Sequence, residues 1–233
     1  MAVRPRPFTR EEYHRLAEIG VLNEDSQVEL LEGRIVDRFP PRGNGGLKIG
    51  HLHLHRFTRD EYHRMMEAGL LGEDDRVELL EGAVLAMSPI GPHHCAVVDF
   101  LVRFFTRSLG DRAIVRVQSP IVLDDGAEPQ PDLALLRPRT DFYRASHPSP
   151  ADILLLIEVA ESSTDVDLET KPPAYARGGV REYWVIDLLH KRVVVHRRPE
   201  GDRYTDVRAF GPEATVSPAN FPDVQLPVVD CLA

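Results

Sequence analysis

Residues 153–188 read ILLLIEVAESSTDVDLETKPPAYARGGVREYWVIDL, and this stretch decides the fold. Two short apolar runs near its ends, residues 153–159 and 182–186, are typical of buried strands. The segment between them fits one helix, residues 167–177. Its paired prolines must lie in the first turn, because proline there loses no intrahelical hydrogen bond. The stretch therefore predicts two strands joined by a helix.

Further apolar or β-branched runs lie on both sides of this unit, separated by Gly, Pro and Asp turns. They predict additional strands at residues 113–123, 132–136 and 192–196. An amphipathic helix is expected at residues 94–109, where apolar side chains recur at helical spacing. The tail from Phe210 onward is interpreted as late edge structure that packs on the core. Together these elements predict an α/β fold with a sheet of roughly five or more strands.

The composition suits a globular protein, because 42% of the 233 residues are hydrophobic, enough for one sizeable core. The longest central apolar run is far shorter than the roughly 20 residues of a membrane helix. Residues 1–9 show no signal-peptide core, so we expect a cytoplasmic protein with no membrane partner. The formal net charge of −9 argues against nonspecific coating of nucleic acid but leaves a local basic cleft open. Cys95 and Cys231 fit neither a disulfide framework nor zinc spacing.

An internal repeat organises the first third of the chain, where residues 8–33 recur as residues 57–82, 49 positions later. Each copy opens with a Thr-x-x-Glu capping box, in which hydroxyl and carboxylate satisfy backbone amides at a helix start. Each copy then continues into a short Val-Glu-Leu-Leu strand and a glycine turn. We therefore predict a helix followed by a hairpin, twice.

The segment between the copies is rich in Pro and Gly at first and is interpreted as a linker. Its alternating His51, His53 and His55 would share one strand face and could hold a metal, but no partner cluster accompanies them. The predicted domains are residues 1–38, a partial repeat; residues 39–55, the linker; and residues 56–233, the main α/β domain.

Three polar residues stand out against the apolar strands: Asp132 opens one, Glu158 ends another, and Lys171 lies near the start of the following helix. If the two strands are antiparallel neighbours, Asp132 and Glu158 lie at the same edge of the sheet. Such a pair suits Mg²⁺, which takes one or two carboxylates and fills its other positions with water and substrate phosphate. Lys171 could then orient or deprotonate the attacking water. The same residues could also be ordinary strand-end charges, with Asp167 and Lys171 paired across a helix turn.

From residue 57 to the C-terminus the chain resembles the Uma-two family of restriction endonucleases, a branch of the PD-(D/E)xK phosphodiesterase superfamily. The matching stretches are, in the family's order, RVELLEGAVLAMSPIGPHH, QPDLALL, LLIEVAESSTDVDLETKPPAYARGGVREYWVIDL and FPDVQLPVVD. The resemblance implies a restriction-endonuclease-like core with a central mixed β-sheet flanked by helices. It also implies hydrolysis of DNA phosphodiester bonds with Mg²⁺, or with Mn²⁺ in its place.

The family motif falls on Asp132 of the PD element, Glu158 of the IEV element and Lys171 of the following helix. The resemblance implies that these three residues are catalytic and that the two carboxylates bind the metal. The superfamily usually has its lysine two residues after the glutamate, where this chain has Ala160, so the lysine is implied to have moved into the next helix. Glu78, in the VELLEG element, is implied as a further metal or water ligand.

Three other residues carry weaker expectations. His94, after the MSP element, is expected to cap or pack a helix, with phosphate contact as the alternative. Tyr175 lies one turn beyond Lys171 and is expected either to face the cleft or to pack against the sheet. Trp184 is expected in the core.

The first copy of the repeat has the family's opening but no PD or IEV element, so it cannot form a site alone. Its Glu29 corresponds to Glu78, and we expect an accessory packing role or a role in a dimer. A homodimer is possible because cutting both DNA strands needs two sites. The alternative function is a catalytically inactive nuclease-fold module that binds DNA or protein. An esterase is disfavoured, because the chain has no Gly-x-Ser-x-Gly element.

Overall fold

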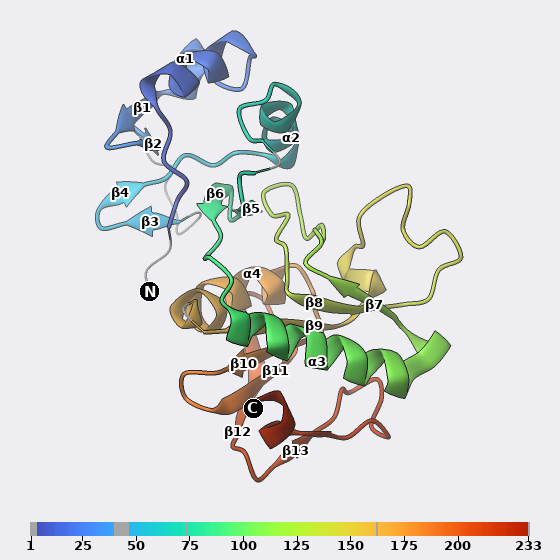
Figure 1. Cartoon of the computed structure of the whole chain (residues 1–233). Coiled ribbons are helices and arrows are strands. Elements are labelled where there is room, and N and C mark those ends of the chain that lie inside the picture. Colours follow the sequence, from blue (N-terminus) through green and yellow to red (C-terminus); the bar gives the residue numbers. More distant parts are fainter. Residues whose placement is uncertain (1–3, 40–46, 73, 162, 233) are drawn as a thin grey trace. The chain divides into compact units, whose positions relative to one another are not determined.

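The computed structural model describes residues 4–39, 47–72, 74–161 and 163–232, and the chain forms two compact units (Figure 1). The sheet unit contains residues 88–123 and 130–233, and the repeat unit contains residues 3–87 and 124–129. None of the helices in the described ranges has the length and apolar character that a membrane crossing requires.

A six-stranded mixed sheet forms the centre of the sheet unit, in the order β12-β11-β10-β9-β8-β7. Its strands are β7 (Ile114–Val117), β8 (Leu133–Leu136), β9 (Ile153–Ala160), β10 (Glu182–Asp187), β11 (Arg192–Glu200) and β12 (Arg203–Phe210). Strands β9 and β10 are parallel, and the other neighbours are antiparallel. A parallel pair needs a crossover, which the helical segment between β9 and β10 provides. The predicted α/β fold with a mixed sheet is confirmed.

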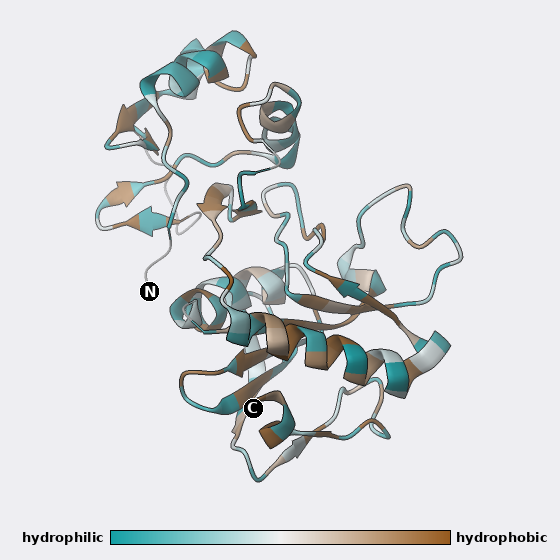
Figure 2. Ribbon diagram, in the orientation of Figure 1, coloured by the Kyte–Doolittle hydropathy of each residue, from teal (hydrophilic) through white to brown (hydrophobic). Residues whose placement is uncertain are grey.

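Helices cover both faces of this sheet because successive side chains of a strand point to opposite faces. Leu133 and Ile157 pack with α3 (Pro92–Leu109) in one buried cluster. Ala134 and Leu156 pack with residues of α4 (Lys171–Arg177) in a second cluster. Figure 2 shows the hydrophobic colour along the central strands and alternating colours along α3. Asp132 and Glu158 are in step with Ala134 and Leu156, so their side chains share the face that α4 covers.

The C-terminal tail packs against the α3 side, as expected. It contains β13 (Thr215–Val216), β14 (Leu226–Pro227) and the 3₁₀ helix Val228–Cys231. Phe221, Leu226 and Cys231 are all buried in the same cluster as α3. Two further 3₁₀ turns, Gly110–Arg112 and Pro150–Asp152, connect elements of the sheet unit.

The strand predictions need correction at four places, one of which is β11, which was predicted to end at residue 196 and continues to Glu200. The strand predicted at residues 113–123 ends at Val117, because Gln118 adopts a positive φ of 41°. Strand β9 continues two residues beyond Glu158, to Ala160. Strand β12 was not predicted, because it is an edge strand whose polar side chains are mostly exposed and which lacks a continuous apolar run.

The repeat unit contains the predicted helix and hairpin twice. The first copy comprises α1 (Arg10–Glu18), the 3₁₀ turn Glu24–Ser26, β1 (Val28–Leu31) and β2 (Arg34–Asp37), and the second comprises α2 (Arg59–Glu67), β5 (Val77–Leu80) and β6 (Ala83–Ala86). Both predicted capping boxes are present, at Thr9 with Glu12 and at Thr58 with Glu61. Part of the predicted linker forms a small hairpin of β3 (Lys48–Ile49) and β4 (Leu52–His53). The first part of that linker, residues 40–46, lies outside the described residues.

The two copies exchange the short segments that precede their helices. Pro5, ahead of α1, pairs with Leu85 of the second copy, and Leu54, ahead of α2, pairs with Val36 of the first. These bridges occupy equivalent positions of the repeat, so the exchange is reciprocal. Side chains of both copies, including Leu16 and Met65, then form one buried cluster. Both copies of the repeat therefore belong to one compact unit. The predicted domains differ from this, because they place the second copy in the main domain, residues 56–233.

Replacing Gly82 by alanine should destabilise the protein more than replacing Gly69. Both glycines have positive φ, 79° and 70°, which costs an alanine about 1–2 kcal/mol at either position. A Cβ at Gly82 would also lie 2.7 Å from the Cβ of Arg56, whereas nothing lies within 4 Å of a Cβ at Gly69. Thermal unfolding should therefore show a larger decrease in Tm for Gly82→Ala, and equal decreases would contradict the close packing at this turn.

Candidate active site

Asp132 and Glu158 lie side by side on neighbouring strands. Strands β8 and β9 are antiparallel with Leu133 opposite Ile157, so Asp132, just before β8, is level with Glu158. The backbone amide of Asp132 donates a hydrogen bond to Oε2 of Glu158 at 3.2 Å. Asp132 is 9% exposed and Glu158 3% exposed. The strand geometry on which the predicted pairing depended is therefore present.

Lys171 reaches Glu158 from α4. Its Nζ lies 2.8 Å from Oε1 of Glu158, and the hydroxyl of Tyr175 donates to the same oxygen at 2.9 Å. Lys171 and Tyr175 are four residues apart, so they lie on one face of the helix. Tyr175 is fully buried, and it both packs against the sheet and contacts the carboxylate. Trp184 is fully buried in the opposite cluster, as expected.

The local sequence fixes where this lysine stands. The π-helical turn Val166–Thr170 leads directly into α4, whose first turn carries the predicted prolines. Proline has no backbone N–H, so the α-helical hydrogen-bond ladder cannot run through Pro172 and Pro173, and the amide of Lys171 donates to the carbonyl of Val166 across the wider π turn. Lys171, the first residue of α4, thus points its buried ammonium group toward Glu158 of β9.

Asp167 belongs to the same cluster, although sequence reasoning did not select it as a site residue. Its Oδ1 lies 3.5 Å from Nζ of Lys171, and the hydroxyl of Ser163 donates to its Oδ2. The side chain is 3% exposed. In the sequence, the four-residue spacing of Asp167 and Lys171 predicts only a pair across a helix turn. In the structure both side chains are buried, so the pair belongs to the polar cluster around Glu158.

His94 contacts Asp132 from the third residue of α3. Its Nε2 lies 3.0 Å from Oδ2 of Asp132, and this oxygen also accepts the backbone N–H of Val159 at 2.9 Å. The side-chain amide of Gln118 donates to Oδ1 at 3.3 Å. Of the two roles expected for His94, capping is wrong, because the N-cap is Gly91 and no side chain caps the helix, whereas packing is confirmed, because His94 is buried. Gln118 was missed because a loop glutamine carries no sequence signal.

His94 and Asp132 shift each other's pKa. Burial opposes protonation of His94, but the hydrogen bond and charge of Asp132, with the charges of Glu161 and Asp167, outweigh it and raise the pKa of His94. Burial alone would raise the pKa of Asp132. The hydrogen bond and charge of His94, the amide of Val159 and the charge of Lys171 together lower it instead. The pair is thus an anionic carboxylate beside a readily protonated imidazole.

The donor set suits a hard divalent cation. Among the residues that the structure describes, no three His, Cys, Asp or Glu side chains form a group able to hold a metal ion by themselves, and this applies to His51, His53 and His55. Mg²⁺ needs only one or two carboxylates, with water and phosphate as its other ligands. Asp132 and Glu158 offer hard carboxylate oxygens side by side, which is the kind of donor that such an ion prefers.

Glu78 lies in the repeat unit, on β5, where it is opposite Leu85 in the hairpin. It is buried, whereas its counterpart Glu29 on β1 is exposed. Asp132, Glu158 and Lys171 all belong to the sheet unit. The assignment of Glu78 as a further ligand therefore stays a prediction.

The six-stranded mixed sheet with helices on both faces has a restriction-endonuclease-like fold, and Lys171 of α4 meets the acidic pair of β8 and β9 on one face of it. A family model named Uma2 and described as "Putative restriction endonuclease" matches residues 59–229. The chain therefore belongs to the Uma2 family, which confirms the resemblance seen in the sequence. The crystal structure of a "putative nuclease belonging to DUF820" from Anabaena variabilis has a similar fold, with a TM-score of 0.59 and 18% identity. The match covers 76% of this chain and 97% of that chain, and no curated protein matches the chain.

Replacing Asp132 by asparagine should lower the pKa of His94 relative to the wild type. The variant keeps the burial that opposes protonation but loses the negative charge that favours it. The pKa can be measured from the imidazole resonances in an NMR titration, with His94→Gln to assign them. In Glu161→Gln the pKa should fall less, because Glu161 acts through charge alone. An unchanged pKa in Asp132→Asn would refute the coupling.

The same pair predicts how stability depends on pH. Because folding raises the pKa of His94, its contribution to stability is fully present below the unfolded value of 6.5 and is lost as the pH rises through the folded pKa. The stability difference between the wild type and His94→Gln should therefore shrink on going from mildly acidic to alkaline pH in denaturant unfolding. A difference that grows over this range would contradict the sign.

Proposed function

We propose that this protein is a divalent-metal-dependent endonuclease that hydrolyses DNA phosphodiester bonds, with Mg²⁺ or Mn²⁺ as its cofactor. The observation that carries the proposal is the buried convergence of Asp132, Glu158 and Lys171, in which Glu158 accepts hydrogen bonds from both other residues. Membership of a restriction-endonuclease family supports the same reaction class.

Asp132 and Glu158 are the residues that would hold the metal. When bound, such an ion polarises a phosphate oxygen and lowers the pKa of a coordinated water. Hydrolysis joins the water oxygen to phosphorus and breaks a P–O ester bond, and the departing oxygen takes up a proton. The Lys171 ammonium is placed to orient the attacking water and to offset negative charge on the phosphate as it develops.

His94, Tyr175 and Gln118 act as positioning residues in this proposal. His94 and Gln118 each bind one oxygen of Asp132, which fixes the rotation of that carboxylate. Tyr175 and Lys171 both donate hydrogen bonds to Oε1 of Glu158, which fixes the rotation of the Glu158 carboxylate as well. Such constraint keeps ligands in place before substrate arrives.

A DNA substrate needs cationic contacts despite the net charge of −9. Arg112 and Arg197 are already engaged by Asp223 and Glu182. Arg103 and Arg107 are both exposed, four residues apart on α3, and they are our candidates for phosphate contact. A homodimer would supply a second site for the second DNA strand, and this too stays a prediction.

The purified protein should nick supercoiled plasmid DNA in the presence of Mg²⁺ or Mn²⁺, and EDTA should stop the reaction. Asp132→Asn, Glu158→Gln and Lys171→Met should each slow cleavage by about 100-fold or more, because each removes a group that stabilises the transition state. The rate is measured on agarose gels as loss of supercoiled plasmid.

Glu213→Gln is the matched control, since it removes one carboxylate from an exposed position of the same unit, and it should cut at the wild-type rate. Circular dichroism and Tm verify that each variant is folded. Equal cleavage by the wild type and Asp132→Asn would overturn the catalytic assignment. DNA binding without cleavage in either metal would favour the inactive nuclease-fold module instead.

A further inference from the structure

The second copy of the repeat holds a peptide segment of this chain, residues 124–129, against β5. Three backbone hydrogen bonds secure it. They join the amide of Glu128 to the carbonyl of Leu79 (2.8 Å), the amide of Gly82 to the carbonyl of Gly126 (2.7 Å) and the amide of Arg59 to the carbonyl of Asp125 (2.6 Å). The contact at Leu79 is an antiparallel bridge, so the segment extends the β5–β6 hairpin by strand addition.

A charged side chain completes this contact. The carboxylate of Glu128 lies 3.0 and 3.1 Å from Nε2 of His63, and Nε of Arg59 lies 3.9 Å away. Glu128 is 4% exposed. A buried carboxylate is stable only when it is paired, so the glutamate and the histidine together anchor the segment.

The first copy carries the same four groups. The residues that hydrogen-bond to the segment or pair with Glu128 are Leu79, Gly82, Arg59 and His63, and 49 positions earlier the chain has Leu30, Gly33, Arg10 and His14, identical in type at each of these four positions. The local backbone agrees as well, because the turn glycines Gly33 and Gly82 have φ values of 77° and 79°. Both copies therefore present the same donors and acceptors in the same local geometry.

The corresponding groups of the first copy have no such partner among the residues that the structure describes. Within the described ranges, no segment pairs with the outer edge of β1 at Leu30, and no hydrogen bond joins the amides of Arg10 and Gly33 to another segment. Leu30 is half-buried where Leu79 is fully buried, and His14 is exposed.

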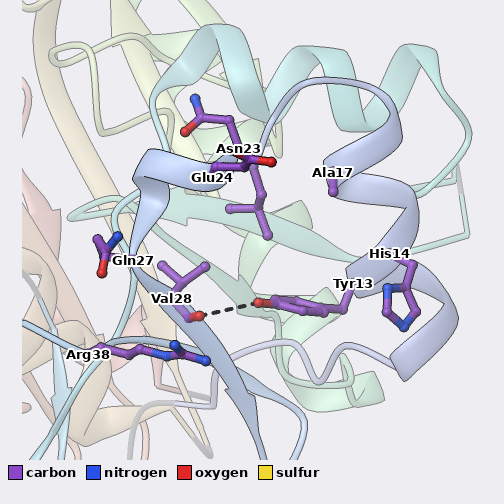
Figure 3. A pocket seen from close by; sticks show the side chains of 9 residues that line it. Tyr13, His14, Ala17, Asn23, Glu24, Gln27, Val28 and Arg38 are labelled. Carbon is purple, nitrogen blue, oxygen red and sulfur yellow. Dashed lines mark hydrogen bonds between the residues drawn. The ribbon is translucent and has the colours of Figure 1, made fainter.

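A surface pocket of about 170 Å³ adjoins His14 in the first copy. Figure 3 shows His14 and Tyr13 of α1 on one side of it and Gln27, Val28 and Arg38 on the other. Ala17 also lines it, at the position where the second copy has the larger Met66. The smaller side chain leaves room next to His14.

We propose that the first copy is a binding site for an extended acidic segment of another protein chain. The occupant adds a strand to the edge of β1 and places a glutamate or aspartate on His14, as residues 124–129 do on the second copy. Residues 124–129 of this chain are held by the second copy, and the occupant we propose is a segment of a different protein molecule. Main-chain groups in strand register recognise a peptide, and Arg10 and His14 correspond to the Arg59 and His63 that lie beside the carboxylate of Glu128 on the second copy, which favours a peptide with negative charge.

The test titrates the full chain with a fluorescent peptide of residues 123–130, LDDGAEPQ, and measures fluorescence anisotropy. We expect saturable binding that weakens about tenfold in His14→Ala and by a similar factor when the peptide glutamate is replaced by glutamine, because each change removes one charged hydrogen bond. Arg15→Ala is the matched control on the exposed face of α1 and should bind as the wild type does.

NMR of the imidazole resonances locates the peptide. A shift of the His14 resonances on binding supports the proposal. A shift confined to His63, which would mean that the peptide displaces residues 124–129 from the second copy, overturns it. Absence of saturable binding, or equal affinity in the wild type and His14→Ala, overturns it too. None of these readouts depends on nuclease activity.

Discussion

The ion pair between Lys171 and Glu158 is the constraint on which the sheet unit depends. The two charged groups are 5% and 3% exposed and 2.8 Å apart. Burying them carries a desolvation cost of several kcal/mol per ion, which is offset only when both are paired and hydrogen-bonded. Glu158 meets this requirement through Lys171, Tyr175 and the amide of Asp132. One carboxylate thus ties α4, β9 and the start of β8 together.

This arrangement sets the chemistry of the site. The Asp132 carboxylate is held in one orientation by hydrogen bonds from His94, Gln118 and the amide of Val159. Asp167 adds a third buried carboxyl group beside Lys171. The Lys171 ammonium contacts the carboxyl groups of Glu158 and Asp167, while His94 contacts that of Asp132. In the proposed function the side chains that hold these strands and helices together are also the ones that would bind the metal.

Sequence reasoning selected Asp132, Glu158 and Lys171, which the structure brings together, because isolated polar residues at the ends of apolar strands are conspicuous and the family motif coincides with them. It could not locate Asp167, since a lysine four residues from an aspartate looks the same on a solvated helix as in a core. His94 and Gln118 acquire their roles from contacts 38 and 14 residues away. Nor could it reveal that the two repeat copies exchange their leading segments, because that pairing is non-local and involves single bridges.

Direct measurement of divalent-cation binding tests the central claim most closely. Mn²⁺ titrated into the apoprotein and followed by electron paramagnetic resonance should lose its free-ion signal through binding to the wild type. Binding should be abolished or greatly weakened in both Asp132→Asn and Glu158→Gln, and retained in Glu213→Gln. A wild type that binds no Mn²⁺, or an Asp132→Asn variant that binds it with wild-type affinity, would contradict the account.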